Sequence, residues 1–155
     1  GGLYRQTEEK EAAVLDSSFH YLIMAEQAML QKGLLARLRG SGLTLGQPKI
    51  LDYLKEHDGA SQKEIAQGSH IEAGTLTSLL NRMEDRGMVE RRMLHGNRRN
   101  SYIFLTDRGK ELLCLVTESF EALEEKAFHS ISNEEREQFM QTLFRIYMNL
   151  TTKED

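Results

Sequence analysis

Residues 61–92 read SQKEIAQGSHIEAGTLTSLLNRMEDRGMVERR and carry the strongest structural signals in the chain. Ser61 and Glu64 have the spacing of a capping box, which predicts a short helix at the start of this stretch. A second helix is predicted from about Glu72 to Gly87. Its inner face consists of apolar residues at helical spacing: Leu76, Leu79, Leu80 and Met83. Two short helices joined by a tight turn make this stretch a helix-turn-helix candidate.

The segment after the helix pair changes from helical to β-type composition. Residues 88–92 and 102–105 are the two β-type runs, and the stretch between them contains Gly96 and two arginines. We therefore predict a two-stranded hairpin with a basic tip. Arginines at such a tip can enter the minor groove of DNA, whereas short polar side chains on a helix reach base edges in the major groove.

Helical apolar patterns also flank the helix pair on its N-terminal side. Residues 8–38 contain no proline and carry apolar residues at spacings of three and four, which predicts one long amphipathic helix. Thr44 and Gln47 fit a capping box, so the next helix is expected over about 45–57. These two helices would precede the helix-turn-helix candidate.

Two further amphipathic helices are predicted after the hairpin. The first begins at Thr106-Asp107, where an acidic residue in the first turn suits the helix dipole. Ser132 and Glu135 form another capping box that introduces the last helix. The apolar stripe of this last helix comprises Phe139, Leu143, Ile146 and Leu150.

Composition and charge distribution narrow the class of protein. The chain has 155 residues, 39% hydrophobic and 28% charged, which is typical of a globular domain. Because no apolar run approaches the roughly 18 residues that a membrane span needs, and the start lacks a signal-peptide pattern, we expect a cytoplasmic protein that binds no membrane. The net charge is −4, but residues 61–110 carry nine Lys and Arg side chains against six Asp and Glu. A basic module between acidic helices favours a nucleic-acid partner for that module.

Catalytic and metal-binding patterns are weak. The single cysteine, Cys114, lies between two leucines in a helical pattern, so we interpret it as a small buried residue rather than a nucleophile or redox sensor. The five histidines show no metal-ligand spacing. Adjacent glutamates at 124–125 and 134–135 point apart on a helix and are interpreted as solvated faces. We therefore expect no enzymatic activity, no metal site and no cofactor.

In combination and order, these motifs resemble the multiple-antibiotic-resistance regulator (MarR) family of winged-helix transcription factors. The resemblance covers the chain from about Ser17 to Leu150. The stretches that carry it are LTLGQ at 43–47, SQKEIA at 61–66, TLTSLLNRMEDRGMV at 75–89, ERR at 90–92, NRR at 97–99 and LTDRG at 105–109. The implied fold is mainly α with a small β-hairpin wing, a winged helix-turn-helix with N- and C-terminal dimerisation helices.

The resemblance also implies an order of parts. A dimerisation helix would occupy residues 1–40, a DNA-binding module 41–108, and further dimerisation helices 109–155. Within the module, the helix-turn-helix would span about 61–86 and the wing about 88–105. The implied partners are a second copy of the chain in an obligate homodimer, palindromic double-stranded promoter DNA, and a small aromatic or oxidising effector.

The candidate site residues follow from this arrangement. The candidate DNA contacts lie on the helix-turn-helix and at the wing tip: Ser61, Gln62, Thr75, Thr77, Ser78, Asn81, Arg82, Asn97, Arg98 and Arg99. By family analogy the effector site is the cleft between the winged module and the dimer helices, where His20 and Met24 could face it, although both equally fit a core. Glu72 departs from the family pattern, because glutamate is a poor N-cap and repels nearby phosphates.

We interpret the chain as a sequence-specific DNA-binding transcriptional regulator, and expect a repressor. The alternative from another class is a winged-helix protein–protein interaction module without DNA binding. The acidic overall charge and Glu72 suit that alternative.

Overall fold

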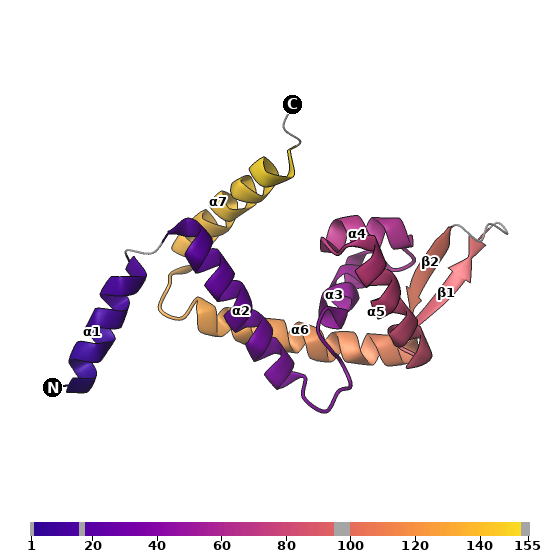
Figure 1. The fold of residues 1–155 in the computed structure, drawn as a ribbon, viewed down its shortest axis with the longest axis horizontal. Helices are drawn as coiled ribbons and strands as arrows, with labels where there is room; N and C mark the ends of the chain where they lie inside the picture. The colour runs from indigo at the N-terminus through magenta and orange to yellow at the C-terminus, as the bar shows by residue number, and fades with distance from the viewer. Residues whose placement is uncertain (1, 16–17, 95–99, 153–155) are drawn as a thin grey trace. The chain divides into compact units, whose positions relative to one another are not determined.

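The computed structural model describes residues 2–15, 18–94 and 100–152. The chain divides into two compact units, Gly1–Phe120 and Glu121–Asp155. The described residues form helices and one two-stranded sheet, labelled in Figure 1, with these bounds: α1 Gly2–Leu15, α2 Phe19–Arg37, α3 Gln47–Glu56, α4 Gln62–Ser69, α5 Ala73–Asp85, β1 Val89–Met93, β2 Ser101–Leu105, α6 Asp107–Ala127 and α7 Asn133–Thr151. This order confirms the predicted fold class.

The core of the first unit lies among α3, α4, α5 and the hairpin. Helix α3 packs on α4, α4 packs on α5, and the hairpin contacts all three helices. Figure 1 shows α3, α4 and α5 grouped together, with β1 and β2 extending from the group. The fully buried side chains come from each of these elements and from α6: Ile50, Leu51, Leu54, Ile65, Leu76, Leu80, Met83, Ile103 and Val116. The predicted inner face of α5 is therefore confirmed.

Local signals set the bounds of α4 and α5. The Ser61 hydroxyl accepts a hydrogen bond from the Glu64 N–H at 3.1 Å, and the Glu64 carboxylate accepts one from the Ser61 N–H at 3.1 Å. This reciprocal pair is the predicted capping box. Helix α5 ends where Gly87 adopts a φ of 70°, and the Met88 N–H donates to the Met83 carbonyl at 2.8 Å. That pattern satisfies the last carbonyls of a helix and turns the chain into the wing.

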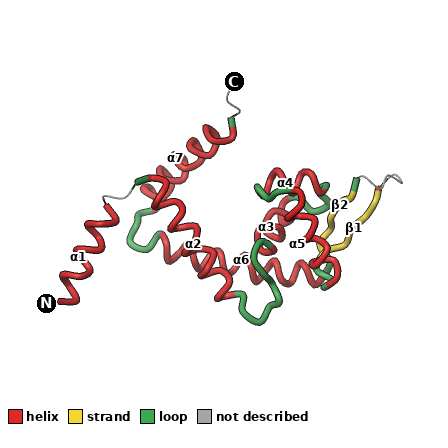
Figure 2. Tube along the Cα trace, viewed as in Figure 1, coloured by secondary structure: helices red, strands yellow, loops and turns green. Residues whose placement is uncertain are grey.

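The wing is tied to the helices by a third extended segment. Strands β1 and β2, drawn in yellow in Figure 2, pair antiparallel. Val89 lies opposite Leu105. On the other side of β2, the Gly59 N–H donates to the Ile103 carbonyl at 2.8 Å, and the Ile103 N–H donates to the Ala60 carbonyl at 2.9 Å. The loop between α3 and α4 therefore extends the sheet, which the sequence pattern did not predict.

Two predicted helix starts are wrong. The single helix expected over 8–38 is interrupted, because Ser18 caps a new helix by accepting a hydrogen bond from the Tyr21 N–H at 3.3 Å. The next helix begins at Gln47 rather than near residue 45, with Gly46 as its N-cap at a φ of 88°. Only half of the expected capping box forms: the Gln47 side chain accepts from the Thr44 N–H at 3.0 Å.

The prediction that Cys114 is buried is also wrong. Its side chain is exposed on α6. The buried positions of this helix include Leu112, Leu113, Val116 and Ser119. At about 100° per residue, Cys114 lies roughly 200° from both Leu112 and Val116, on the opposite face of the helix. The leucine on either side of the cysteine was therefore a poor guide to burial.

The second unit contains the end of α6, a short loop and α7. The Phe128 and Phe139 rings meet edge to face, with centroids 6.0 Å apart, and the Arg136 guanidinium lies 4.2 Å from the centre of the Phe128 ring. Arg136 also pairs with Glu124 at 3.9 Å. The Ser132 hydroxyl accepts from the Glu135 N–H at 3.1 Å and caps α7, which is one of the two bonds of the expected capping box. Glu124-Glu125 and Glu134-Glu135 are exposed, in agreement with the interpretation as solvated faces.

Candidate nucleic-acid interface

The start of α4 carries two of the candidate residues, Ser61 and Gln62. The hydrogen bonds from Ser61, first from its backbone N–H and then from its hydroxyl, hold the pKa of the Glu64 carboxyl below its ordinary value. Beside this cap, the Gln62 amide nitrogen donates to the Thr77 hydroxyl of α5 at 2.6 Å. Gln62 and Thr77 therefore fix α4 against α5, and Ser61 holds the first turn of α4.

The outward face of α5 is polar and its inward face is apolar. Thr75, Thr77, Ser78, Asn81 and Arg82 are all exposed. The hydroxyl of Thr77 donates to the Ala73 carbonyl at 2.9 Å, and the hydroxyl of Ser78 donates to the Gly74 carbonyl at 3.4 Å. These bonds orient two short side chains along the helix surface, and the Ser78 hydroxyl keeps acceptor capacity beyond its donation to Gly74. The arrangement is that of a helix able to present polar groups to a groove.

Glu72 is the N-cap of α5 and is exposed, and no side-chain capping hydrogen bond forms at this helix start. The N–H groups of the first turn therefore lack a side-chain partner from that residue. A helix start with open N–H groups attracts anions, whereas the neighbouring carboxylate repels them. Both influences act where a phosphate would approach α5.

The wing contributes two arginines with different surroundings. Arg91 on β1 donates from Nη2 to the Asn81 Oδ1 at 3.2 Å, and its Nε lies 3.7 Å from the Glu84 Oε2. Arg92 pairs with Glu90 at 3.2 Å and lies 4.2 Å from the centre of the Phe104 ring. Its side chain is 50% exposed, against 26% for Arg91.

The sequence pattern did not predict a role for Arg91, because its partners Asn81 and Glu84 lie on another element, α5, and are brought to it by packing. The only available signal was the pair of arginines that follows the apolar start of β1. The wing-tip candidates Asn97, Arg98 and Arg99 lie outside the described residues, so their contact with DNA stays a prediction.

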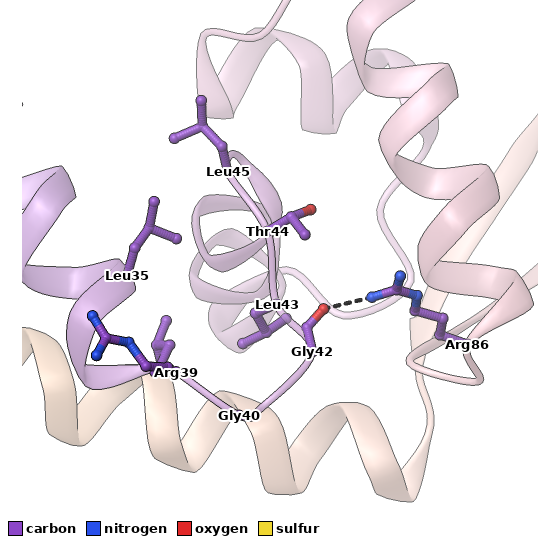
Figure 3. A pocket seen from close by; sticks show the side chains of 9 residues that line it. Leu35, Arg39, Gly40, Gly42, Leu43, Thr44, Leu45 and Arg86 are labelled. Atoms are coloured by element: carbon purple, nitrogen blue, oxygen red, sulfur yellow. Dashed lines mark hydrogen bonds between the residues drawn. The ribbon is translucent and has the colours of Figure 1, made fainter.

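A pocket of about 720 Å³ opens between the end of α2, the loop to α3 and the end of α5. Figure 3 shows the Arg86 side chain reaching this loop, where its Nη1 donates to the Gly42 carbonyl at 2.6 Å. The lining residues are Leu35, Leu38, Arg39, Gly40, Gly42, Leu43, Thr44, Leu45 and Arg86. His20 and Met24 do not line this pocket; both are exposed on α2, where His20 lies 3.3 Å from the Ser18 hydroxyl.

Helices α2 and α7 expose large apolar side chains. On α2 these are Phe19, Tyr21, Ile23, Met24, Met29 and Leu30. On α7, where no residue is buried, they are Phe139, Met140, Phe144, Tyr147, Met148 and Leu150. Apolar patches of this kind are typical of interaction surfaces.

The described ranges contain neither a membrane-spanning helix nor a metal-binding cluster. None of the helices there combines the length and the apolar content required to cross a lipid bilayer. Over the same residues, His, Cys, Asp and Glu form no group of three or more placed to hold a metal ion.

Comparisons with known proteins agree with this geometry. The MarR family profile matches residues 43–101, which cover the end of the loop before α3, the helix-turn-helix and most of the wing. TtmR of Methylorubrum extorquens, an HTH-type transcriptional regulator, is 35% identical over 107 residues, which cover 69% of this chain and 55% of TtmR. The transcriptional regulator HosA of Escherichia coli is 30% identical over 107 residues, which cover 69% of this chain and 78% of HosA.

The fold comparison extends beyond the matched segment. The crystal structure of the S. aureus MepR–DNA complex superimposes with a TM-score of 0.79 at 25% identity, and covers 88% of this chain and 100% of MepR. The matching profile, the relatives and this shared structure agree with one another. The chain belongs to the MarR family of transcriptional regulators.

Proposed function

We propose that the chain binds double-stranded promoter DNA sequence-specifically through α5 and the wing, and that it represses transcription from the bound promoter. The observation that carries this proposal is the exposed polar face of α5, fixed from one side by Gln62 of α4 and from the other by Arg91 of β1. A polar helix face held rigidly against two neighbouring elements suits readout of base edges. The DNA in the MepR complex supports the same use of the fold.

Selection from a random library tests this proposal directly. The full chain is incubated with 30-bp duplexes of randomised sequence, and bound duplexes are amplified and sequenced. We expect one enriched sequence, bound at least about a thousandfold more tightly than a scrambled duplex at physiological salt. Equal binding to both, or no binding to either, would favour the protein–protein interaction module instead.

The exposed apolar faces of α2 and α7 support a homodimer as the binding form. A two-fold dimer places two α5 helices in successive major grooves, so its site is a palindrome with half-sites about one helical turn apart. The enriched sequence should therefore be palindromic. A single asymmetric half-site would contradict the dimeric arrangement.

The sign of regulation needs its own measurement. The enriched sequence is placed between a reporter gene and its promoter, and the chain is expressed from a second plasmid. We expect reporter activity to fall when the chain is present, because the bound dimer obstructs polymerase. A rise in reporter activity would identify an activator.

The pocket beside Arg86 is the site we propose for a small aromatic effector. Its leucines offer an apolar surface, and the Arg39 guanidinium offers a partner for an acidic group. Benzoate is a suitable probe, titrated into the complex with the enriched duplex. Release by benzoate that is lost in Leu35→Trp supports this pocket, at the end of α2. Loss in His20→Ala or Met24→Ala would instead place the effector near the start of α2.

A further inference from the structure

Arg91 occupies an unusual position for a residue on a DNA-facing wing. It lies in the middle of β1, opposite Ile103 in the sheet register, and reaches two residues one helical turn apart on α5. Its Nη2 donates to the Asn81 Oδ1 at 3.2 Å, and its Nε lies 3.7 Å from the Glu84 Oε2. The Arg91 side chain is about half as exposed as that of Arg92, because it lies against α5 rather than in solvent.

This contact fixes which way the Asn81 amide faces. A guanidinium carries only donors, so the atom that Arg91 meets must be the amide oxygen of Asn81. Because an amide presents its oxygen and its nitrogen on opposite sides, the N–H2 group is turned away from the wing strand. Asn81 itself is exposed on the outward face of α5.

The fixed orientation limits what Asn81 can recognise. A freely rotating asparagine pairs with adenine through both amide atoms, accepting from N6 and donating to N7. With its oxygen held by Arg91, Asn81 offers the DNA its two N–H donors. Donors of this kind meet acceptor atoms, which on DNA are guanine O6, purine N7 and thymine O4 in the major groove, or the phosphate oxygens.

We propose that Arg91 is a positioning residue that locks Asn81 as a hydrogen-bond donor toward acceptor atoms on the DNA. This inference rests on the proposed DNA-binding function. Glu84 takes part through its ion pair with the Arg91 Nε at 3.7 Å, which adds a second link between α5 and β1. Arg91 acts through Asn81 and does not itself need to touch DNA.

Asn81→Asp tests the N–H2 donors of Asn81 separately from its oxygen. Aspartate keeps an oxygen for Arg91 and strengthens that contact by its charge, but removes both donors. We expect the melting temperature to hold or rise while affinity for the enriched duplex falls about tenfold or more. Gln67→Glu, an equal change of charge on the exposed side of α4, is the matched control. Binding by Asn81→Asp that equals the control on both enriched and scrambled duplexes would overturn the donor role.

The two sources of acceptor give different results. A loss confined to the enriched duplex identifies a base edge. An equal loss on enriched and scrambled duplexes, with a lower dependence of log K on log salt, identifies a phosphate. Asn81→Ala, which removes both donors without adding a charge, should show the same pattern of loss. A loss seen in Asn81→Asp but absent in Asn81→Ala is charge repulsion and would overturn the donor role.

A double-mutant cycle tests whether Arg91 acts through Asn81. Arg91→Met is made in the wild-type chain and in the Asn81→Ala chain, and both are titrated with the enriched duplex. We expect Arg91→Met to weaken binding about three- to tenfold in the first background and to have little further effect in the second. Equal losses in both backgrounds would show that Arg91 acts on its own charge and overturn the inference. If the wild-type chain enriches no sequence, the proposed function fails first and the inference falls with it.

Discussion

The winged module and the terminal helices differ in how far they bury their apolar side chains. In the module, α3, α4, α5 and the hairpin bury Ile50, Leu80 and Ile103 completely among themselves. Helix α7 has no buried residue, and its Phe144 side chain remains 61% exposed. The module therefore buries its apolar face within one chain, whereas the apolar face of α7 stays exposed, and the proposed homodimer would cover it.

Removal of α7 should produce the largest effect, because it deletes the exposed apolar face of the terminal helices. A chain that ends before Ser132 lacks α7 and its apolar face, so it should lose the dimer or aggregate. The intact chain should run at about twice 17.8 kDa in light scattering. A well-folded monomer, from either the intact or the shortened chain, would show that the terminal helices do not assemble the protein.

Single substitutions should distinguish the two regions by their dependence on protein concentration. Leu80→Ala removes a fully buried side chain and should lower the free energy of unfolding by about 2–5 kcal/mol. Phe144→Ala should act mainly on dimerisation, so its effect on urea unfolding should grow as the protein is diluted. A Phe144→Ala effect that is the same at every concentration would place that ring inside a single chain.

A smaller effect tests the close contact between the wing and α6. At Gly109, an added Cβ would collide with the Met88 carbonyl oxygen. Gly109→Ala should therefore destabilise the module by about 1–3 kcal/mol. Gly74 is the matched control, since nothing lies within 4 Å of an added Cβ there, and Gly74→Ala should leave stability unchanged or raise it by up to about 1 kcal/mol. Equal melting temperatures for both variants would contradict the packing of α6 on the wing.

The smallest expected effect concerns Cys114, which is exposed on α6. A thiol reagent should modify it in the native protein at a rate close to that of the unfolded chain, and Cys114→Ser should change stability by less than about 0.5 kcal/mol. Protection of the thiol that disappears on dilution would show that the dimer covers this face of α6.

The predictable part of the fold is the part that local signals specify. The Ser61–Glu64 capping box, the apolar period of α5 and the glycine after it each act within a few residues, and together they located the helix-turn-helix and the wing. The break at Ser18 was missed, because a serine inside an apolar period is compatible with both a continued helix and a new cap. The burial of Cys114 was misjudged from its neighbours in sequence rather than from the helical period.

The sequence predicted which residues make up the site, but not the hydrogen bonds that join them across elements. The exposed polar residues of α5 follow from its period, whereas the contacts of Gln62 with Thr77 and of Arg91 with Asn81 join residues 15 and 10 positions apart. Such pairs depend on how two elements pack, which no local pattern encodes. The same holds for the pairing of Gly59 and Ala60 with β2.

We propose that α5 reads base edges while the wing adds affinity for the DNA backbone, and a salt titration separates these two contributions. Wild type, Thr75→Ala and Arg99→Ala are each titrated with the enriched and the scrambled duplex from low to high salt. Thr75→Ala should cost about 1–3 kcal/mol on the enriched duplex and spare the scrambled one. Arg99→Ala should weaken both and lower the slope of log K against log salt by roughly one. If Thr75→Ala weakens both duplexes equally, or neither, α5 does not read the sequence and the account is contradicted.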